Sequence, residues 1–192
     1  MTEDSPDQCP VIVAIAGPNG AGKTTFFHSH LHEAGLRFVN ANDIARELDI
    51  SPYEAAEIAD ALRRELVSQR ESFVFETVFS DPAGDKVTFL NEAVFAGYNV
   101  ILCFIGISGG ETSEERVAMR VSQGGHDVPS EKLAARYPRS LANLKAAIQT
   151  LPVVLVFDND DLADPFRKVA EFHQGRKVNL ADSMPPWMAS VM

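Results

Sequence analysis

The chain contains few cysteines and no long apolar run. It has only two thiols, Cys9 and Cys103, with no metal-ligand spacing around either, so we expect both to be reduced and structural. No apolar run approaches the roughly 20 residues needed to cross a bilayer. The first ten residues, MTEDSPDQCP, are acidic and polar rather than basic and then apolar. These absences predict a soluble cytoplasmic protein without a membrane partner.

Positive charge is also in short supply. Lysine and arginine total 17 against 27 aspartates and glutamates, which gives a formal net charge of -10 and a pI of about 4.9. Such a surface repels a polyanion, so the composition predicts no nucleic-acid partner. A small anionic ligand needs only a local positive site.

The length and the apolar pattern predict one α/β domain. With 192 residues, 45% of them hydrophobic, the chain can build one sizeable core but not two full domains. Apolar runs suited to buried strands alternate with helix-length stretches, at 11–16, 37–39, 73–75, 100–106 and 153–157. This alternation is typical of a mostly parallel, here five-stranded, sheet with helices on both faces. We expect the domain over 11–173, an N-terminal extension over 1–10, and a C-terminal tail over 174–192 that is either loose or a small packed flap.

One helix is predicted from its spacing. Within residues 53–70, Ile58, Leu62 and Leu66 recur every four residues. This pattern predicts a helix that packs the apolar stripe on the sheet and leaves the charged residues around it, such as Arg63, in solvent.

A glycine-rich segment directly follows the first apolar run. Residues 17–24 read GPNGAGKT, the Gly-x-x-x-x-Gly-Lys-Thr pattern of a phosphate-binding loop (P-loop, or Walker A). A buried strand ending in such a turn points backbone N–H groups inward as an anion cradle, and the following helix adds the positive end of its dipole. The predicted nucleotide-binding residues are Gly17, Pro18, Asn19, Gly20, Ala21, Gly22, Lys23, Thr24 and Thr25.

Two residues of this loop carry specific chemistry. Lys23 would reach the β- and γ-phosphates of ATP, and the Thr24 hydroxyl would ligate Mg²⁺. The alternative is an ordinary glycine-rich turn with a surface lysine.

An acidic residue follows the second predicted strand. Asp43 lies just past the carboxyl end of that strand, the edge at which open α/β sheets bind ligands. A carboxylate there could accept the proton of a hydroxyl that attacks a γ-phosphate. The alternative is that Asp43 caps the short helix that follows. Arg46 could bind a substrate phosphate or lie on the helix surface.

A second polar pair follows the third predicted strand. Glu76 and Thr77 end the run FVFET over 73–77, so they should lie at the same sheet edge. They could orient a sugar acceptor or assist Mg²⁺. The alternative is an ordinary polar strand end.

Basic residues gather around a glycine turn. Arg116, Arg120, Lys132, Arg136 and Arg139 flank GGHDVP at 124–129. In so acidic a chain, this cluster over about 112–140 predicts a helical arginine lid that closes on phosphates, stabilises their charge and excludes water. The alternative is a solvated helical hairpin.

Other patterns point elsewhere but fail on context. ISGGE at 107–111 resembles the signature of ABC-type ATPases, and VVLVFD at 153–158 resembles their Mg²⁺-binding strand end. The two lie about twice as far apart as in that family, and Asn159 stands where Glu is normal. Three histidines over 28–32 suggest a metal site, but without another ligand nearby they are interpreted as exposed helix residues.

Four segments together resemble the zeta-toxin-like P-loop kinases of bacteria, especially their small stand-alone branch. They are GPNGAGKTT at 17–25, VNANDIAREL at 39–48, FETVFS at 75–80 and RVAMRVSQGGHDVPSEKLAARYPRSLANL at 116–144. The resemblance covers about residues 11–159. It implies a P-loop NTPase three-layer sandwich with the strand order of nucleoside monophosphate kinases, Mg²⁺ and ATP as cofactors, and transfer of the γ-phosphate to a hydroxyl.

The resemblance also implies an acceptor and a partner. Zeta toxins phosphorylate UDP-N-acetylglucosamine and are silenced by an antitoxin that obstructs the ATP site, which implies a UDP-sugar and a protein antitoxin here. The family's functional positions fall on Lys23 and Thr24 for nucleotide and metal, Asp43 for the catalytic base, Glu76 and Thr77 for the region facing the acceptor, and Arg120 and Arg136 for the lid.

Two other classes of function stay open. An ATPase whose hydrolysis drives motion would turn over ATP without an acceptor and would not need Asp43. A non-catalytic nucleotide-binding partner in a toxin–antitoxin or regulatory complex would bind ATP and transfer nothing.

Overall fold

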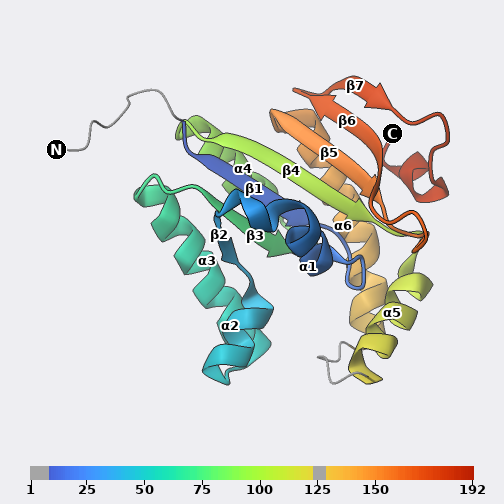
Figure 1. The fold of residues 1–192 in the computed structure, drawn as a ribbon, viewed down its shortest axis with the longest axis horizontal. Coiled ribbons are helices and arrows are strands. Elements are labelled where there is room, and N and C mark those ends of the chain that lie inside the picture. The colour runs from blue at the N-terminus through green and yellow to red at the C-terminus, as the bar shows by residue number, and fades with distance from the viewer. Residues whose placement is uncertain (1–8, 123–128) are drawn as a thin grey trace.

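The computed structural model of the chain describes residues 9–122 and 129–192. These residues form one seven-stranded sheet in the order β2-β3-β1-β4-β5-β6-β7 (Figure 1). The strands are β1 (Val11–Ala16), β2 (Arg37–Val39), β3 (Phe73–Thr77), β4 (Asn99–Gly106), β5 (Val153–Asp158), β6 (Arg167–His173) and β7 (Arg176–Leu180). The α-helices are α1 (Lys23–Phe26), α2 (Ala41–Leu48), α3 (Pro52–Ser68), α4 (Asp85–Phe95), α5 (Gly110–Ser122) and α6 (Ser130–Thr150). Three short helical segments are η1 (Phe27–Leu31), η2 (His32–Ala34) and η3 (Pro186–Ser190).

The five predicted strands are confirmed as β1 to β5, and they pair with one another in parallel. The expected count of five is wrong for the described residues, because β6 and β7 extend the sheet in antiparallel fashion beyond β5. Their sequences, RKVAEFH and RKVNL, mix charged and apolar residues, and β7 is exposed along its whole length. They therefore lack the continuous apolar run that marks a strand covered on both faces.

Helices cover both faces of the sheet, which confirms the three-layer α/β sandwich. Along β1, Ile12, Ala14 and Ala16 join a larger apolar cluster, whereas Val13 and Ile15 join a smaller one on the opposite face. This alternation follows from the two-residue repeat of a strand.

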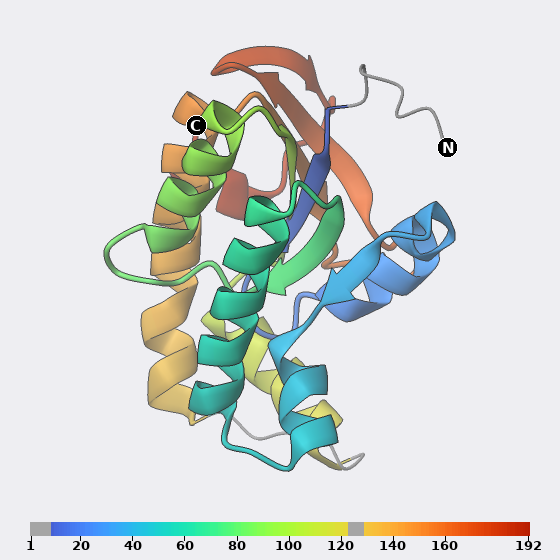
Figure 2. The same ribbon diagram turned by 90° about the vertical axis from the view of Figure 1, so that its left-hand side faces the viewer.

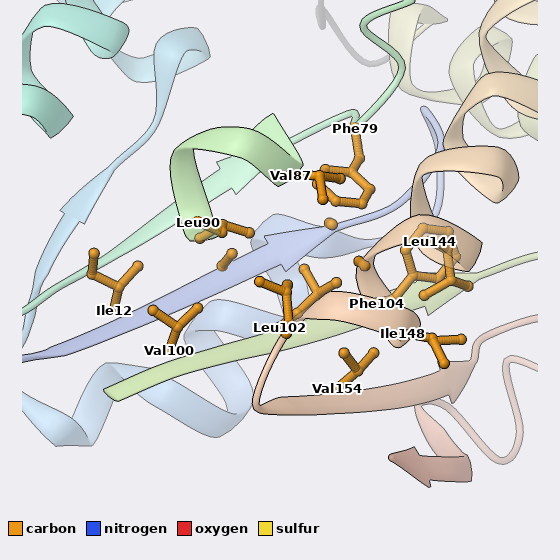
Figure 3. Packing of buried hydrophobic residues seen from close by; sticks show 14 of the residues in the cluster. Ile12, Phe79, Val87, Leu90, Val100, Leu102, Phe104, Leu144, Ile148 and Val154 are labelled. Atoms are coloured by element: carbon orange, nitrogen blue, oxygen red, sulfur yellow. The ribbon is translucent and has the colours of Figure 1, made fainter. Parts of the chain in front are cut away.

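The larger cluster lies under helices α3, α4 and α6, which stand together on one side of the sheet (Figure 2). Leu90 of α4, Leu144 of α6 and Leu102 of β4 belong to this cluster, and all three are fully buried (Figure 3). On the opposite face, Phe26 and Phe27 anchor α1 and η1 in the smaller cluster.

Helix α3 exists where predicted, and two residues of the predicted stripe, Leu62 and Leu66, pack on the larger cluster, but the buried face is shifted away from Ile58. Its buried residues are Ala55, Ala59, Arg63 and Leu66, whereas Ile58 is 42% exposed. Small side chains at two of these positions let the helix backbone approach the sheet closely, which favours this face over the bulkier isoleucine. The helix therefore carries an arginine inward.

Part of residues 174–192, the predicted C-terminal tail, packs on the same core. Trp187, Met188 and Val191 belong to the larger apolar cluster. The Trp187 ring lies so close to Gly106 that a Cβ at this glycine would overlap it. The division of the chain at residue 173 stays a prediction.

Among the described residues, no helix combines the length and the apolar character that crossing a membrane requires.

Candidate functional site

The P-loop connects the central strand β1 to α1 and leaves no space for larger residues. At Gly17, φ is +145° and a Cβ would overlap the carbonyl oxygen of Ile105 on β4. At Gly22, φ is +88° and a Cβ would lie 2.8 Å from Nδ2 of Asn159. The two positions need glycine both for backbone conformation and for space.

Lys23 is buried rather than a surface lysine. The residue is only 6% exposed, and its Nζ donates a hydrogen bond to the carbonyl of Pro18 at 3.0 Å. The lysine thus folds back over the loop, so the alternative of a turn with a surface lysine is wrong. Of the other predicted loop residues, Thr25 is exposed.

Two side chains outside the motif hold the loop, and the sequence analysis missed both roles. Asn159, after β5, donates from Nδ2 to the carbonyl of Ala21 at 2.9 Å. Ser113, on α5, donates from Oγ to the carbonyl of Asn19 at 2.7 Å. Buried carbonyls of this kind need partners. The only sequence signal was the position of Asn159 beside a strand end, which marks the ligand-binding edge of the sheet.

Glu76 lies beside the hydroxyl of Thr24. Thr24 Oγ1 donates to Glu76 Oε2 at 2.6 Å, and Asn40 Nδ2 donates to the same oxygen at 3.3 Å. A hydroxyl and a carboxylate oxygen are hard ligands that suit Mg²⁺, which is usually bound by one or two carboxylates together with substrate phosphates. The Thr24 hydroxyl and the Glu76 carboxylate lie together, so they are donors that fit such a shared site.

An open cavity of about 240 Å³ begins at Glu76. It lies between α2, α3, the segment after β3, and α6. Its lining residues are Asn40, Ala41, Asn42, Ala56, Ala59, Asp60, Arg63, Glu76, Thr77, Val78, Phe79, Ser80, Asp81, Lys86 and Arg136. Of the predicted site residues, the cavity therefore brings together Glu76, Thr77 and Arg136.

Asp43 lies in the first turn of α2 but does not cap it. The N-cap is Asn40, whose Oδ1 accepts a hydrogen bond from the backbone N–H of Asn42 at 2.9 Å. The capping alternative for Asp43 is therefore wrong. The Asp43 carboxylate instead pairs with Arg46 at 2.8 Å. Neither residue lines the cavity in the described structure. The last residue of α2 that does so is Asn42, directly before Asp43.

The residues of the predicted lid form α5 and the first part of α6. Their basic side chains lie at different places in the structure. Arg116 donates to the carbonyl of Asp160 at 3.0 Å, beside the P-loop, while Arg136 lines the cavity. Lys132 donates to the hydroxyl of Tyr53 on α3 at 2.8 Å. The side chain of Arg120 and most of the predicted glycine turn, residues 123–128, lie outside the described part of the chain.

Two tyrosines near the site, Tyr137 and Tyr53, have pKa values shifted in opposite directions. Tyr137 donates to the carbonyl of Ile107 at 2.8 Å. Burial, helped by Asp160 and Asp158, raises its pKa to about 12. Tyr53, next to Lys132, has a lowered pKa because it accepts the lysine hydrogen bond and faces its charge.

The residues that suggested other families have structural partners. Asp158 is buried, accepts from Trp187 Nε1 at 2.9 Å and pairs with Arg167 at 3.4 Å, so its carboxylate faces the C-terminal segment. His28 and His32 are exposed, which agrees with their interpretation as surface residues.

Solved structures share this fold. A chain in the crystal structure of AvrRxo1-ORF1:AvrRxo1-ORF2 with sulphate ions aligns with a TM-score of 0.60 at 18% identity, over 91% of this chain and 61% of that one. A chain of the same pair crystallised with ATP aligns with a TM-score of 0.57 at 20% identity, over 88% of this chain and 60% of that one. A chain of the PezAT toxin–antitoxin system of Streptococcus pneumoniae aligns with a TM-score of 0.56 at 15% identity, over 96% of this chain and 77% of that one. The chain thus spans about 61% of the length of the AvrRxo1 chain.

Sequence comparison agrees with the fold. No curated protein sequence matches the chain significantly. The Zeta toxin family model, however, matches residues 40–167, a range that contains the cavity residues but begins after the P-loop. Because this match spans more than half of the chain, the chain belongs to the zeta toxin family.

Proposed function

We propose that the chain is a kinase that transfers the γ-phosphate of ATP to a hydroxyl of a small acceptor. The observation that carries the proposal is the position of Glu76. Its carboxylate is bonded to Thr24 of the P-loop and also lines the cavity. A phosphate held by the loop and an acceptor in the cavity would therefore meet at one side chain, the proximity that phosphoryl transfer requires.

The nucleotide half would be formed by residues 17–25. Backbone N–H groups of the loop and Lys23 would bind the phosphates. Thr24, assisted by Glu76, would hold Mg²⁺, which neutralises charge that develops on the phosphates.

The acceptor half would supply a base and a lid. Asp43 would take the proton of the acceptor hydroxyl as its oxygen bonds to phosphorus and ADP leaves. To do so it would leave Arg46, which then could bind a substrate phosphate. Arg136, with Arg120, would stabilise the transferring phosphoryl group, and Thr77 would contact the acceptor.

Family membership supports a finer proposal. We take UDP-N-acetylglucosamine as the acceptor, a protein antitoxin as the partner and the cytoplasm as the place of action. The PezAT structure, which shares the fold, is a toxin–antitoxin system, and an AvrRxo1 structure was solved with ATP.

The test is transfer of label from γ-labelled ATP with Mg²⁺ to UDP-sugars, nucleosides and dinucleotides. Lys23→Ala should lower transfer at least about a hundredfold, since the lysine contacts the transferring phosphates. Asp43→Asn should lower it about 10²- to 10⁴-fold, the usual contribution of a general base. Asp49→Asn, at the exposed C-cap of the same helix and therefore at the end opposite Asp43, is the control and should leave the rate unchanged.

The rival functions give different results. An ATPase would release free phosphate equally from native and Asp43→Asn protein and label no acceptor. A non-catalytic partner would bind ATP and release nothing. Either outcome would reject the kinase.

A further inference from the structure

Helix α2, which carries Asp43, has little apolar packing to hold it in place. It follows β2, the edge strand of the sheet (Figure 1). The structure describes all eight of its residues, and none of them is buried. Ala41 and Ile44 are partly buried and pack on the larger apolar cluster. Burial of apolar area therefore contributes little to fixing this helix, and its position depends also on polar contacts at its first turn.

Asn40 is bonded to this first turn in two ways. Its side-chain Oδ1 accepts from the backbone N–H of Asn42 at 2.9 Å. Its backbone carbonyl accepts from the N–H of Ile44 at 3.1 Å. The first bond gives a partner to an N–H group that has none within the helix, and the second is the first bond of the helical ladder. The start of α2 therefore follows the position of Asn40.

The same side chain is bonded to the P-loop side of the site. Asn40 is only 4% exposed, and its Nδ2 donates to Glu76 Oε2 at 3.3 Å. The same carboxylate oxygen accepts from Thr24 Oγ1 at 2.6 Å. Only this orientation of the amide gives the N–H of Asn42 an acceptor and the carboxylate a donor. One buried amide thus connects the start of α2 to the residue that binds the P-loop hydroxyl.

Capping alone does not require an asparagine at position 40. Aspartate and serine accept a backbone N–H bond at an N-cap about as well as asparagine does, and the N-cap of α3 is Ser51. Asparagine adds an amide that donates to a carboxylate while its oxygen caps the helix. The residue type therefore fits the bond to Glu76 as well as the cap.

We propose that Asn40 is a positioning residue, which holds α2 and the Asp43 carboxylate in place relative to Glu76 and Thr24. The inference rests on the proposed function, in which Asp43 is the base and the P-loop holds the phosphates. Displacing a reacting group by about 1 Å can lower a rate about a hundredfold. Asn40 acts through Asp43, because its amide neither takes a proton nor carries charge.

The link is tested first without nucleotide, by NMR hydrogen exchange. Glu76→Ala removes the acceptor of the Asn40 amide, 36 residues away in sequence. Exchange at the N–H groups of Asn42 and Ile44 should become about 3- to 10-fold faster, since local opening of the helix start then breaks one bond fewer. Unchanged exchange at both would overturn the inference.

Two controls show whether the effect is local. The N–H of Glu54, which is bonded to Ser51 Oγ at the start of α3, should exchange at the same rate in native and Glu76→Ala protein. Glu92→Ala, which removes an exposed glutamate of α4, should change none of these rates. Equal acceleration at Glu54 would show general loosening of the fold and would contradict a specific link to α2.

Substitutions of Asn40 separate the link from the cap. Asn40→Asp and Asn40→Ser keep an acceptor for the helix start but lose the amide donor, and serine adds no charge. Both should lower kcat about 10- to 100-fold, with the acceptor KM and the unfolding temperature changed far less. Asn40→Ala loses both contacts and should also lower the unfolding temperature. A role in capping alone would leave kcat of Asn40→Asp and Asn40→Ser near the native value, which contradicts the proposal.

The two proposals fail separately. Faster exchange in Glu76→Ala, without transfer to any acceptor by native protein, would reject the kinase and keep the link between Glu76 and α2. Transfer by native protein that Asn40→Ser leaves unchanged would keep the kinase and reject the positioning role.

Discussion

The P-loop and the cavity beside Glu76 are built differently. The P-loop is held by buried hydrogen bonds from distant segments, through Asn159 and Ser113, and Lys23 is folded onto it. The cavity is instead lined by charged groups, among them the buried Arg63, and the exposed Asp43–Arg46 pair follows the lining residue Asn42 in sequence. Backbone carbonyls with fixed partners make a pre-formed cradle, whereas charges around an open cavity gain from a ligand.

The strongest test of the rigid half is Gly17→Ala. A Cβ would overlap Ile105 across the central strand pair, and φ of +145° is strained for alanine. We expect a loss of about 3 kcal/mol or more in the free energy of unfolding, since the strands must separate to accommodate the methyl group. Urea unfolding measures it.

Gly35→Ala is the matched control. Gly35 also has positive φ, at +66°, but nothing lies within 4 Å of the position that a Cβ would occupy there. Only the backbone strain of about 1–2 kcal/mol should remain. Equal losses in the two variants would show that crowding against β4 does not constrain the loop.

A smaller effect is expected from Asn159→Ala. It removes the donor to the Ala21 carbonyl and the acceptor, at 3.3 Å, of the Phe166 N–H. Leaving a buried carbonyl without its partner should cost about 1–3 kcal/mol and weaken ATP binding by loosening the loop. Urea unfolding and ATP titration measure the two effects.

The exposed Asn179 of β7 gives the control. Asn179→Ala should change the free energy of unfolding by no more than about 0.5 kcal/mol. Unaltered ATP affinity in Asn159→Ala would show that the loop keeps its shape without this amide.

The same contrast explains what the sequence could predict. The P-loop is a contiguous motif, and β1, β3, β4 and β5 each contain a run of at least three apolar residues, so local pattern was sufficient for both. Asn159 and Ser113 act through contacts that span 138 and 94 residues of sequence, which no local pattern reveals. In α3 the apolar stripe pointed to Ile58, but close packing favoured the alanine face and brought Arg63 with it.

The mildest test compares the ionisation of the three tyrosines of the chain. It needs no substitution among the proposed site residues. Tyr53 should ionise below its usual pKa of about 10 because of Lys132, whereas burial raises the pKa of Tyr98, and that of Tyr137 to about 12. Absorbance at 295 nm should therefore show one early step and two late ones. Tyr53→Phe should remove the early step, and Lys132→Gln should move it upward.

These shifts also fix the sign of the pH dependence. Between pH 10 and about 12 the unfolded chain has lost the Tyr137 proton while the folded chain keeps it, so this group makes the folded state less stable as pH rises. Tyr53 acts in the opposite direction, because its lowered pKa means that the folded chain loses this proton first. Three tyrosines that titrate together near pH 10 would show that the α6–α3 contact and the burial of Tyr137 do not persist in solution. Separate steps would show that the burial of Tyr137 and the contact of Tyr53 with Lys132 persist in solution.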